Sequence, residues 1–291
     1  MQKAPDCEVT HKLKYMLCND GSKASVDALQ TIYHGLMRPQ DELFVACAWN
    51  VQKEEYVPYN CKKEYIKKMA TSSCAALGDR FHWVEHELVD GQVAKEVLVQ
   101  QAEEHSVDIM VTGFHGRKGP KDDPTVMGSA VQFMSINCPK PIMVIKDPHK
   151  RAERPNGYSL AVCVDGSDHS IRALNLLCDI CGEHDKIVVI VCEQSNIDIK
   201  KVTDSIEYHL EEKNCHHKAK SEIKILPAET GRKTCDIVRE YLLSHVAEEY
   251  IDFILVGNKG ADFSDKTTKH YLGSVANAIL RNTKINVLFL P

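Results

Sequence analysis

The sequence YMLCNDGS at residues 15–22 returns as LAVCVDGS at residues 160–167, an offset of 145 residues (160 − 15). To within one residue, the same offset carries Gly113 to Gly257, Gly116 to Gly260, Gly128-Ser129 to Gly273-Ser274, and PIMVI (141–145) to NVLFL (286–290). Solenoid repeats are roughly 20–50 residues long, so a period this long is typical of a duplicated domain. The chain therefore contains two diverged copies of one folding unit.

The two copies are separated by DPHKRAERPNG at 147–157, a polar stretch whose two prolines and glycine give it the composition of a linker. We accordingly predict one domain over residues 1–147, a linker over 148–157, and a second domain over 158–291.

Within each copy, short apolar runs alternate with longer segments of helical periodicity, which predicts a parallel sheet covered on both faces. Strands are expected at 14–19, 42–48, 81–89, 108–113 and 141–146, then at 159–164, 186–192, 222–228, 252–257 and 285–290. Helices are expected at 23–38, 55–77, 91–105 and 128–137, then at 168–183, 198–217, 231–249 and 273–282. Right-handed crossovers make each copy a five-stranded α/β domain with a flavodoxin-like or Rossmann-like topology, whose ligands bind at the carboxyl ends of the strands.

Composition narrows the function. The chain has 291 residues, 43% hydrophobic and 26% charged, with a formal net charge of −5. These values are ordinary for a globular protein, and they give no electrostatic reason to expect nucleic acid or an anionic membrane as a partner. The polar N-terminus lacks a secretory signal, and no run approaches the about 18 apolar residues of a membrane helix. We expect a cytoplasmic protein whose phosphate sites are local.

The twelve cysteines of such a chain are expected to be reduced thiols, many of them packed in apolar strands. Cys178 and Cys181 form a C-x-x-C near the end of a predicted helix, followed by Cys215, His216 and His217. Zinc needs four convergent ligands, and the first copy has no counterpart of this set. A redox C-x-x-C sits at a helix N-terminus instead, so we interpret these cysteines as packed helix thiols and predict no metal site.

A phosphate site is predicted after the fourth strand of each copy, where VTGFHG (111–116) and VGNKG (256–260) precede Gly-Ser and an apolar helix. Glycine tolerates positive φ and lets a ligand approach the backbone, while a helix N-terminus offers free N–H groups to an anion. The predicted phosphate contacts are Gly113, Gly116, Gly128 and Ser129 in one copy, and Gly257, Gly260, Gly273 and Ser274 in the other. Taken singly, such glycines are equally typical of loops and helix caps, and their recurrence in two copies favours an inherited site.

Asp20 and Asp165 follow the first strand of their copies at the point where the strand order reverses. Their carboxylates could accept hydrogen bonds from a ribose or an adenine edge, or could simply complete the turn. The serines that follow are expected to cap the next helix.

A strand ending in Asp, G-x-x-G after the fourth strand, and Gly-Ser before the last helix together resemble the universal stress protein family in its nucleotide-binding branch. The resemblance covers about 12–146 and 158–291. It implies ATP or another adenine nucleotide, with Mg²⁺ or Mn²⁺, and a regulatory role in stress adaptation. It also implies contacts from residues beside the motifs: Asn19, Ala48, Ala130, Val164, Cys192 and Val275. The loops of eleven residues (117–127) and twelve residues (261–272) before the Gly-Ser pairs are longer than the family's pattern.

Basic residues in these loops could neutralise phosphate charge, although surface lysines are commonly just solvated. They are Arg117, Lys118, Lys121, Lys259, Lys266 and Lys269, of which Arg117 and Lys259 enter the predicted site.

No motif places a catalytic base, so we predict no catalytic residue and at most a weak ATPase. Three hypotheses stay open: a nucleotide-dependent regulator of unidentified protein partners, a nucleotide-independent interaction module with degenerate sites, and a slow ATP hydrolase. The resemblance further implies that PIMVI and NVLFL pack together as an intramolecular pseudo-dimer, and it leaves open whether the chain also forms a homodimer.

Overall fold

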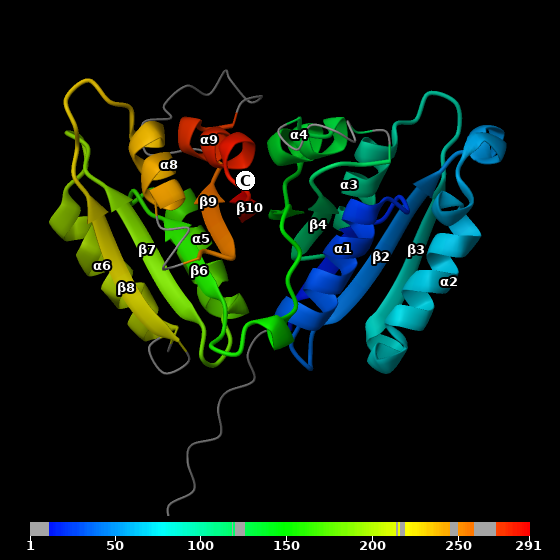
Figure 1. Ribbon diagram of the computed structural model, residues 1–291, viewed down its shortest axis with the longest axis horizontal. Helices are drawn as coiled ribbons and strands as arrows, with labels where there is room; N and C mark the ends of the chain where they lie inside the picture. Colours follow the sequence, from blue (N-terminus) through cyan, green and yellow to red (C-terminus); the bar gives the residue numbers. More distant parts are fainter. Residues whose placement is uncertain are drawn as a thin grey trace, which may run out of the picture.

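The computed structural model describes residues 12–117, 119, 126–213, 215, 219–244, 250–258 and 272–291. Its ten strands form one sheet in the order β3-β2-β1-β4-β5-β10-β9-β6-β7-β8 (Figure 1). The first half contributes β1 (Lys14–Cys18), β2 (Glu42–Trp49), β3 (Phe81–Glu87), β4 (Ile109–Gly113) and β5 (Ile142–Ile145). The second half contributes β6 (Ser159–Cys163), β7 (Lys186–Cys192), β8 (Lys220–Leu226), β9 (Phe253–Gly257) and β10 (Asn286–Leu290).

All strand pairs within each half are parallel, and β1 and β6 each lie between the second and fourth strands of their own half. The strand order therefore reverses beside β1 and beside β6, as in doubly wound folds. The predicted fold class, two tandem five-stranded parallel α/β units, is confirmed.

The halves join through β5 and β10, the two strands that the resemblance implied would pack together. They pair antiparallel, with Met143 opposite Leu288. Because each strand would otherwise leave an unpaired sheet edge, this pairing turns two five-stranded sheets into one ten-stranded sheet.

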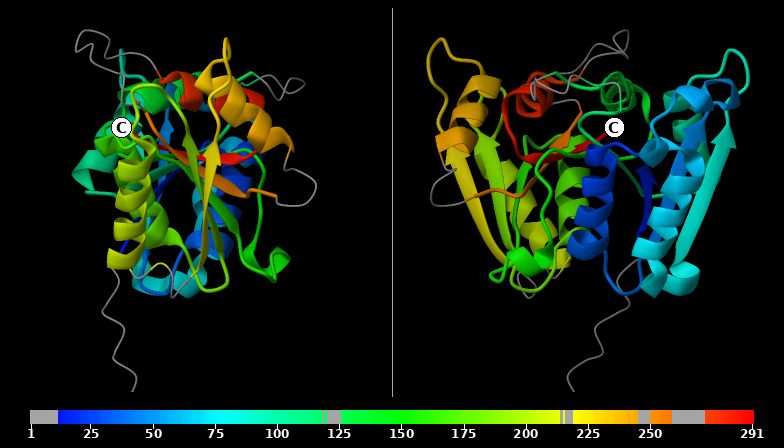
Figure 2. Two further views of the ribbon diagram at one scale, coloured as in Figure 1. Left: turned by 90° about the vertical axis from the view of Figure 1, so that its left-hand side faces the viewer. Right: turned by 45° about the vertical axis from the view of Figure 1, so that its right-hand side comes forward.

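Helices cover both faces of the sheet (Figure 2). The helices are α1 (Lys23–Thr31), α2 (Lys63–Ser73), α3 (Ala94–Glu104), α4 (Ser129–Asn137), α5 (Asp168–Ile180), α6 (Ile199–Glu212), α8 (Thr234–Ser244) and α9 (Ser274–Asn282). One buried cluster packs α1, α2, α5 and α6 on the sheet, and the other packs α3, α4, α8 and α9. Each cluster draws residues from both halves, so each face of the sheet has a core that spans the junction.

The helix predicted at 55–77 is wrong in its first part. The chain there forms two short 3₁₀ segments, Val51–Tyr56 and Tyr59–Cys61, and α2 begins only at Lys63. Pro58 lies between the segments, where its missing N–H and fixed φ prevent a continuous α-helix. Beyond α2, the end of the predicted span lies in a further 3₁₀ segment, Ala75–Arg80, so the apolar periodicity that suggested one helix is divided between four elements.

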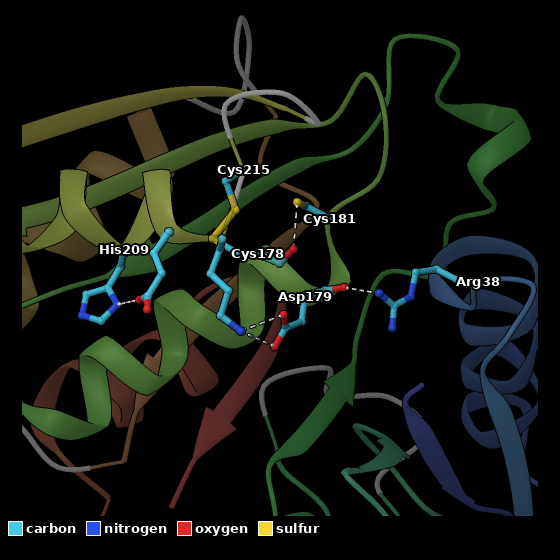
Figure 3. Close-up of a disulfide and its surroundings, with 8 residues drawn as sticks. Arg38, Cys178, Asp179, Cys181, His209 and Cys215 are labelled. Carbon is cyan, nitrogen blue, oxygen red and sulfur yellow. Dashed lines mark hydrogen bonds and ion pairs between the residues drawn. A yellow bond between two sulfur atoms is a disulfide. The ribbon is translucent and has the colours of Figure 1, made fainter. Parts of the chain in front are cut away.

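A disulfide corrects the prediction that all cysteines are reduced thiols. Cys178, in the last turn of α5, is bonded to Cys215, while Cys181 donates its thiol to the Cys178 carbonyl at 3.2 Å (Figure 3). The C-x-x-C spacing singled out Cys178 and Cys181 as a pair. The tertiary fold instead packs α5 against α6, and Cys178 is bonded to Cys215. His216 and His217 lie outside the described residues.

The segment joining the halves is anchored to them by arginines. Arg151 pairs with the fully buried Asp185 and also donates to the carbonyl of Gly35 in the first half at 3.0 Å. Arg154 pairs with the buried Asp252 at 2.7 Å. A segment with the composition of a linker is thus held by charged hydrogen bonds to buried carboxylates, and the predicted domain limits stay a prediction.

Among the described helices, none is both long enough and apolar enough to cross a bilayer.

Candidate functional site

A cavity of about 480 Å³ lies in the second half, at the carboxyl ends of β6, β7 and β9 and beside the first residues of α8 and α9. Seven of the residues predicted from sequence line it: Val164, Asp165, Cys192, Gly257, Gly273, Ser274 and Val275. The other two predicted in this half, Lys259 and Gly260, lie outside the described residues, as do Lys266 and Lys269. The fold therefore brings together, around one cavity, residues from four separate stretches of sequence.

The floor of the cavity is the start of α9. The N–H of Gly273 donates to the carbonyl of Asn258 at 2.8 Å, which fixes this glycine next to the end of β9. The N–H groups of the first helical turn, from Ser274 onward, have no partner within the helix and carry the positive end of its dipole. This arrangement favours an anion in the cavity.

Asp165 lies in the turn between β6 and α5. Its Oδ1 accepts hydrogen bonds from the N–H of Ser167 at 3.0 Å and from the hydroxyl of Ser167 at 2.6 Å, and Ser167 caps α5. Both functions considered for this aspartate are therefore compatible, because the carboxylate completes the turn and also lines the cavity.

In the first half, the corresponding aspartate is contacted by the backbone of the chain after β4. The N–H of Arg117 donates to Oδ2 of Asp20 at 2.7 Å, so the chain after β4 lies directly on the aspartate. A Cβ on Gly116 would lie 3.0 Å from the same oxygen. The carboxylate that would meet a ligand is thus occupied by a backbone group.

The other first-half glycines are packed in the same way. A Cβ on Gly113 would lie 2.6 Å from the backbone of Ala24, and one on Gly128 would lie 3.2 Å from the carbonyl of Phe114. Neither glycine has positive φ; in the described turns that hold the aspartates, Gly21 and Gly166 have it instead. We expected glycine at the predicted phosphate contacts because it tolerates positive φ. This reason is wrong for Gly113 and Gly128, where the lack of a side chain allows close packing instead.

A smaller cavity of about 240 Å³ remains in the first half. Three predicted residues line it, namely Asp20, Ala48 and Arg117. The other predicted residues of this half lie outside its lining: Asn19, Gly113, Gly116, Gly128, Ser129 and Ala130. Asn19 accepts from the N–H of Gly21 at 2.9 Å and from the Ser25 hydroxyl at 3.0 Å, so its side chain holds the turn. Lys118 and Lys121 are not among the described residues.

Comparison with known families decides the relationship. The model of the universal stress protein family matches residues 14–146 and again residues 159–291. The chain belongs to the universal stress protein family. Comparison with curated proteins gave no match.

Solved structures share this fold over almost the whole chain. A universal stress protein from Archaeoglobus fulgidus is 15% identical, with 95% of each chain covered and a TM-score of 0.58. A Pseudomonas aeruginosa protein assigned to the same family is 9% identical, with 97% of this chain and 94% of that chain covered and a TM-score of 0.60. The cytoplasmic domain of a prokaryotic cation chloride cotransporter is 7% identical, with 96% and 95% covered and a TM-score of 0.51. At these identities the likeness concerns the fold alone.

Sequence reasoning missed one wall of the cavity in this universal stress protein. Arg232, Lys233 and Thr234 line it from the start of α8. The signal was available, because Gly231 before α8 repeats Gly91 before α3, and both have positive φ. Arg232 pairs with Glu229 at 2.7 Å, whereas Lys233 makes no ion pair among the described residues. Lys233 is therefore available to an anionic ligand.

The thiols of the cavity are not nucleophiles at neutral pH. Burial, with a smaller contribution from Asp165, raises the pKa of Cys163 to about 12, and burial also raises the pKa of Cys192. Only a thiolate attacks efficiently, so both side chains act as small apolar groups of the wall. Within the described residues, no group of three or more His, Cys, Asp or Glu side chains could hold a metal ion.

Lys146, directly after β5 in the first half, contacts the carboxyl end of α9, the helix whose first residues line the cavity. Its ammonium donates to the carbonyls of Ile279 at 3.2 Å and Thr283 at 2.9 Å, and also to that of Leu280. These are carbonyls of the last turn of α9, where a cation is favoured by the helix dipole. The orientation of α9 against the sheet is thus fixed partly by a residue of the first half.

Burial lowers the pKa of Lys146 to about 7, which predicts a pH-dependent stability. Between about pH 7 and about pH 10.4 the unfolded chain holds a proton on this lysine that the folded chain has lost, so the free energy of unfolding should rise with pH, by at most about 1.4 kcal/mol per pH unit. We expect urea unfolding at several pH values to show this rise in the wild type relative to Lys146→Met. Parallel curves for the two proteins would contradict the prediction.

Proposed function

We propose that this chain is a nucleotide-binding regulator whose second half binds one adenine nucleotide, such as ATP, and whose first half no longer does so. The observation that carries the proposal is the difference between the two cavities. The second-half cavity measures about 480 Å³ and is lined by Asp165 and the Gly273-Ser274 helix start, whereas the first-half cavity measures about 240 Å³ and is not lined by Gly128 or Ser129.

The cavity supports a nucleotide by its size and its chemistry. Small-molecule sites commonly measure about 300–1,000 Å³. Its floor offers the free N–H groups at the start of α9, Lys233 offers a positive charge, and Asp165 offers a carboxylate to ribose or adenine hydroxyl and amino groups. Phosphates against α9 and the nucleoside towards Asp165 would satisfy both sets of groups.

A divalent cation would enter with the nucleotide. Mg²⁺ keeps several waters and binds through substrate phosphates with few protein ligands, so the lack of a ligand cluster in the described residues is compatible with a metal–nucleotide complex. Binding then shifts an equilibrium between conformations and so controls a partner. We assign no hydrolytic step, because the cavity's aspartate is held by its own turn and its thiols are protonated.

Isothermal titration of the full chain with ATP and Mg²⁺ tests the proposal. We expect a stoichiometry near one nucleotide per chain. Asp165→Ala should weaken binding about 10–100-fold, because a hydrogen bond to a charged group contributes about 1.5–3 kcal/mol. The matched variant Asp20→Ala should leave the affinity unchanged, since Gly128 and Ser129, the first-half counterparts of the proposed phosphate contacts, do not line the cavity beside Asp20.

Two equal sites per chain, or equal losses in the two variants, would contradict the assignment to the second half. Absence of binding at millimolar ATP would instead favour the second candidate, a nucleotide-independent interaction module, which the closed first half already supports.

A further inference from the structure

The segment at 50–62, between β2 and α2, is specific to the first half. Its counterpart between β7 and α6 has only the six residues 193–198, so the first half carries seven more residues here (13 − 6). The segment contains the two 3₁₀ turns and no α-helix. An addition of this kind is not required by the fold, because the second half closes the same connection without it.

This segment packs onto the first-half turn. The thiol of Cys61 donates to the carbonyl of Gly21 at 3.4 Å, and a Cβ on Gly21 would lie 2.6 Å from the Cα of Cys61. The segment therefore forms one wall of the cavity of about 240 Å³. The opposite wall is the connection between β3 and α3. In this connection the N–H of Leu88 donates a hydrogen bond to the carbonyl of Trp49, at the end of β2, at 2.7 Å.

Large apolar side chains are exposed on both walls. Tyr56 and Tyr59 are 79% and 74% exposed, and Val89 is 62% exposed. Together with Val51 and Val93, which are also exposed, we call these residues the tyrosine patch. In Figure 1 this corner is the blue 3₁₀ turn at the far right and the loop that follows β3.

The tyrosine patch has no counterpart in the second half. Aligning Gly91 with Gly231 places Glu229 where Val89 stands and Lys233 where Val93 stands. Exposed apolar patches of this kind mark interaction sites, and tyrosine is enriched in protein interfaces. We therefore interpret the tyrosine patch as an interaction site for a partner, separate from the nucleotide cavity of the second half.

The charge around the cavity indicates what that partner is. Lys53, Lys62 and Arg117 line the cavity, and their charged groups make no ion pair or hydrogen bond among the described residues. The lining also holds two acidic residues, Asp20, which accepts from the N–H groups of Arg117 and Ser22, and Glu54. Cations still outnumber carboxylates in the lining, and beside exposed tyrosines this excess matches an acidic ligand with an apolar group.

The size of the cavity favours a peptide side chain over a nucleotide. At about 240 Å³ it is smaller than the common small-molecule site, but it has room for one large side chain.

We propose that the tyrosine patch and the cavity it borders form a docking surface for an acidic peptide segment of a partner protein. An apolar side chain of the peptide enters the cavity, and its flanking Asp or Glu residues pair with Lys53, Lys62 and Arg117. The tyrosines on one wall and Val89 on the other cover the peptide and exclude water from these contacts. This surface is independent of nucleotide binding in the second half.

A peptide-display selection tests the proposal with the full-length protein. A random dodecapeptide library is selected on the wild type after removal of peptides that bind Tyr56→Ser/Tyr59→Ser. Enriched peptides are synthesised with fluorescein and titrated by anisotropy. We expect a consensus of Asp or Glu around an aromatic or aliphatic residue, and binding that weakens as salt rises from about 50 to about 500 mM.

Charge reversal provides the decisive comparison. Lys53→Glu/Lys62→Glu should weaken the selected peptides about tenfold or more. The matched control Lys200→Glu/Lys201→Glu, on exposed residues of α6, makes the same change in net charge and should have no effect.

Several results would overturn the proposal: no peptide enriched over the counter-selection, enriched peptides without acidic residues, or equal affinity for the two charge variants. A concentration-dependent dimer that Tyr56→Ser/Tyr59→Ser abolishes would also overturn it, because the occupant would then be a second copy of the chain.

Discussion

Gly273→Val should lower the affinity for ATP about a hundredfold. Gly273 lines the second-half cavity directly before α9, and its N–H is held by the carbonyl of Asn258 at 2.8 Å. A branched side chain here takes up space beside the first free N–H groups of the helix, where we place the phosphates. Losing one or two hydrogen bonds to charged phosphate costs about 3 kcal/mol, which corresponds to about two orders of magnitude in the dissociation constant.

Gly128→Val is the matched control, because Gly128 occupies the same position before α4 in the first half. Its Cβ would press on the carbonyl of Phe114 at 3.2 Å, so we expect some loss of stability but an unchanged affinity for ATP. Affinity is measured by calorimetry and folding by circular dichroism, with Gly273→Ala as the milder substitution if the valine variant does not fold. Equal effects of the two valine variants on ATP binding would contradict the proposed site.

Arg151→Met should destabilise the folded chain by about 3–5 kcal/mol, the cost typical of removing one partner of a buried ion pair. The carboxylate of Asp185 is fully buried, and Arg151 donates to both of its oxygens. Two backbone donors would remain, the N–H of Tyr158 at 2.7 Å and that of Gly182 at 2.8 Å. They solvate the charge only partly, and the guanidinium's contact with the Tyr158 ring and with Gly35 is lost as well.

Urea unfolding monitored by circular dichroism measures the effect. Arg281→Met is the control, because Arg281 is exposed and its Nε bonds only Asn277 on its own helix. That variant should change stability by less than about 0.5 kcal/mol. A loss below about 1 kcal/mol for Arg151→Met would mean that the segment between the halves is not anchored as the structure indicates.

The two copies differ around their turn aspartates. In the second half the helix starts at Thr234 and Ser274 and the aspartate at 165 line a cavity of about 480 Å³. In the first half the chain after β4 covers Asp20, and the added segment at 50–62 covers Gly21. Duplication allows such a division, because one copy can keep a ligand site while the other exposes a surface for a partner. Lys146 on the end of α9 is a physical link between the two.

The sequence by itself determined the duplication, the fold class and seven of the residues that line the second-half cavity. These follow from local rules, since apolar periodicity and crossover handedness fix the sheet, and parallel strands bring their carboxyl ends to one edge. The turn aspartates and the glycines before α4 and α9 repeat in register, so their relative positions were readable without coordinates.

Only the tertiary structure decided how much space each half leaves beside its turn aspartate. Whether Arg117 lies on Asp20, or residues 59–61 on Gly21, depends on how loops with no periodic pattern pack against a turn far away in sequence. The same holds for the partner of Cys178, for the 3₁₀ turns around Pro58 and for the burial of Lys146. Each is set by a close contact between segments that are distant in the chain, and a local sequence pattern does not specify such a contact.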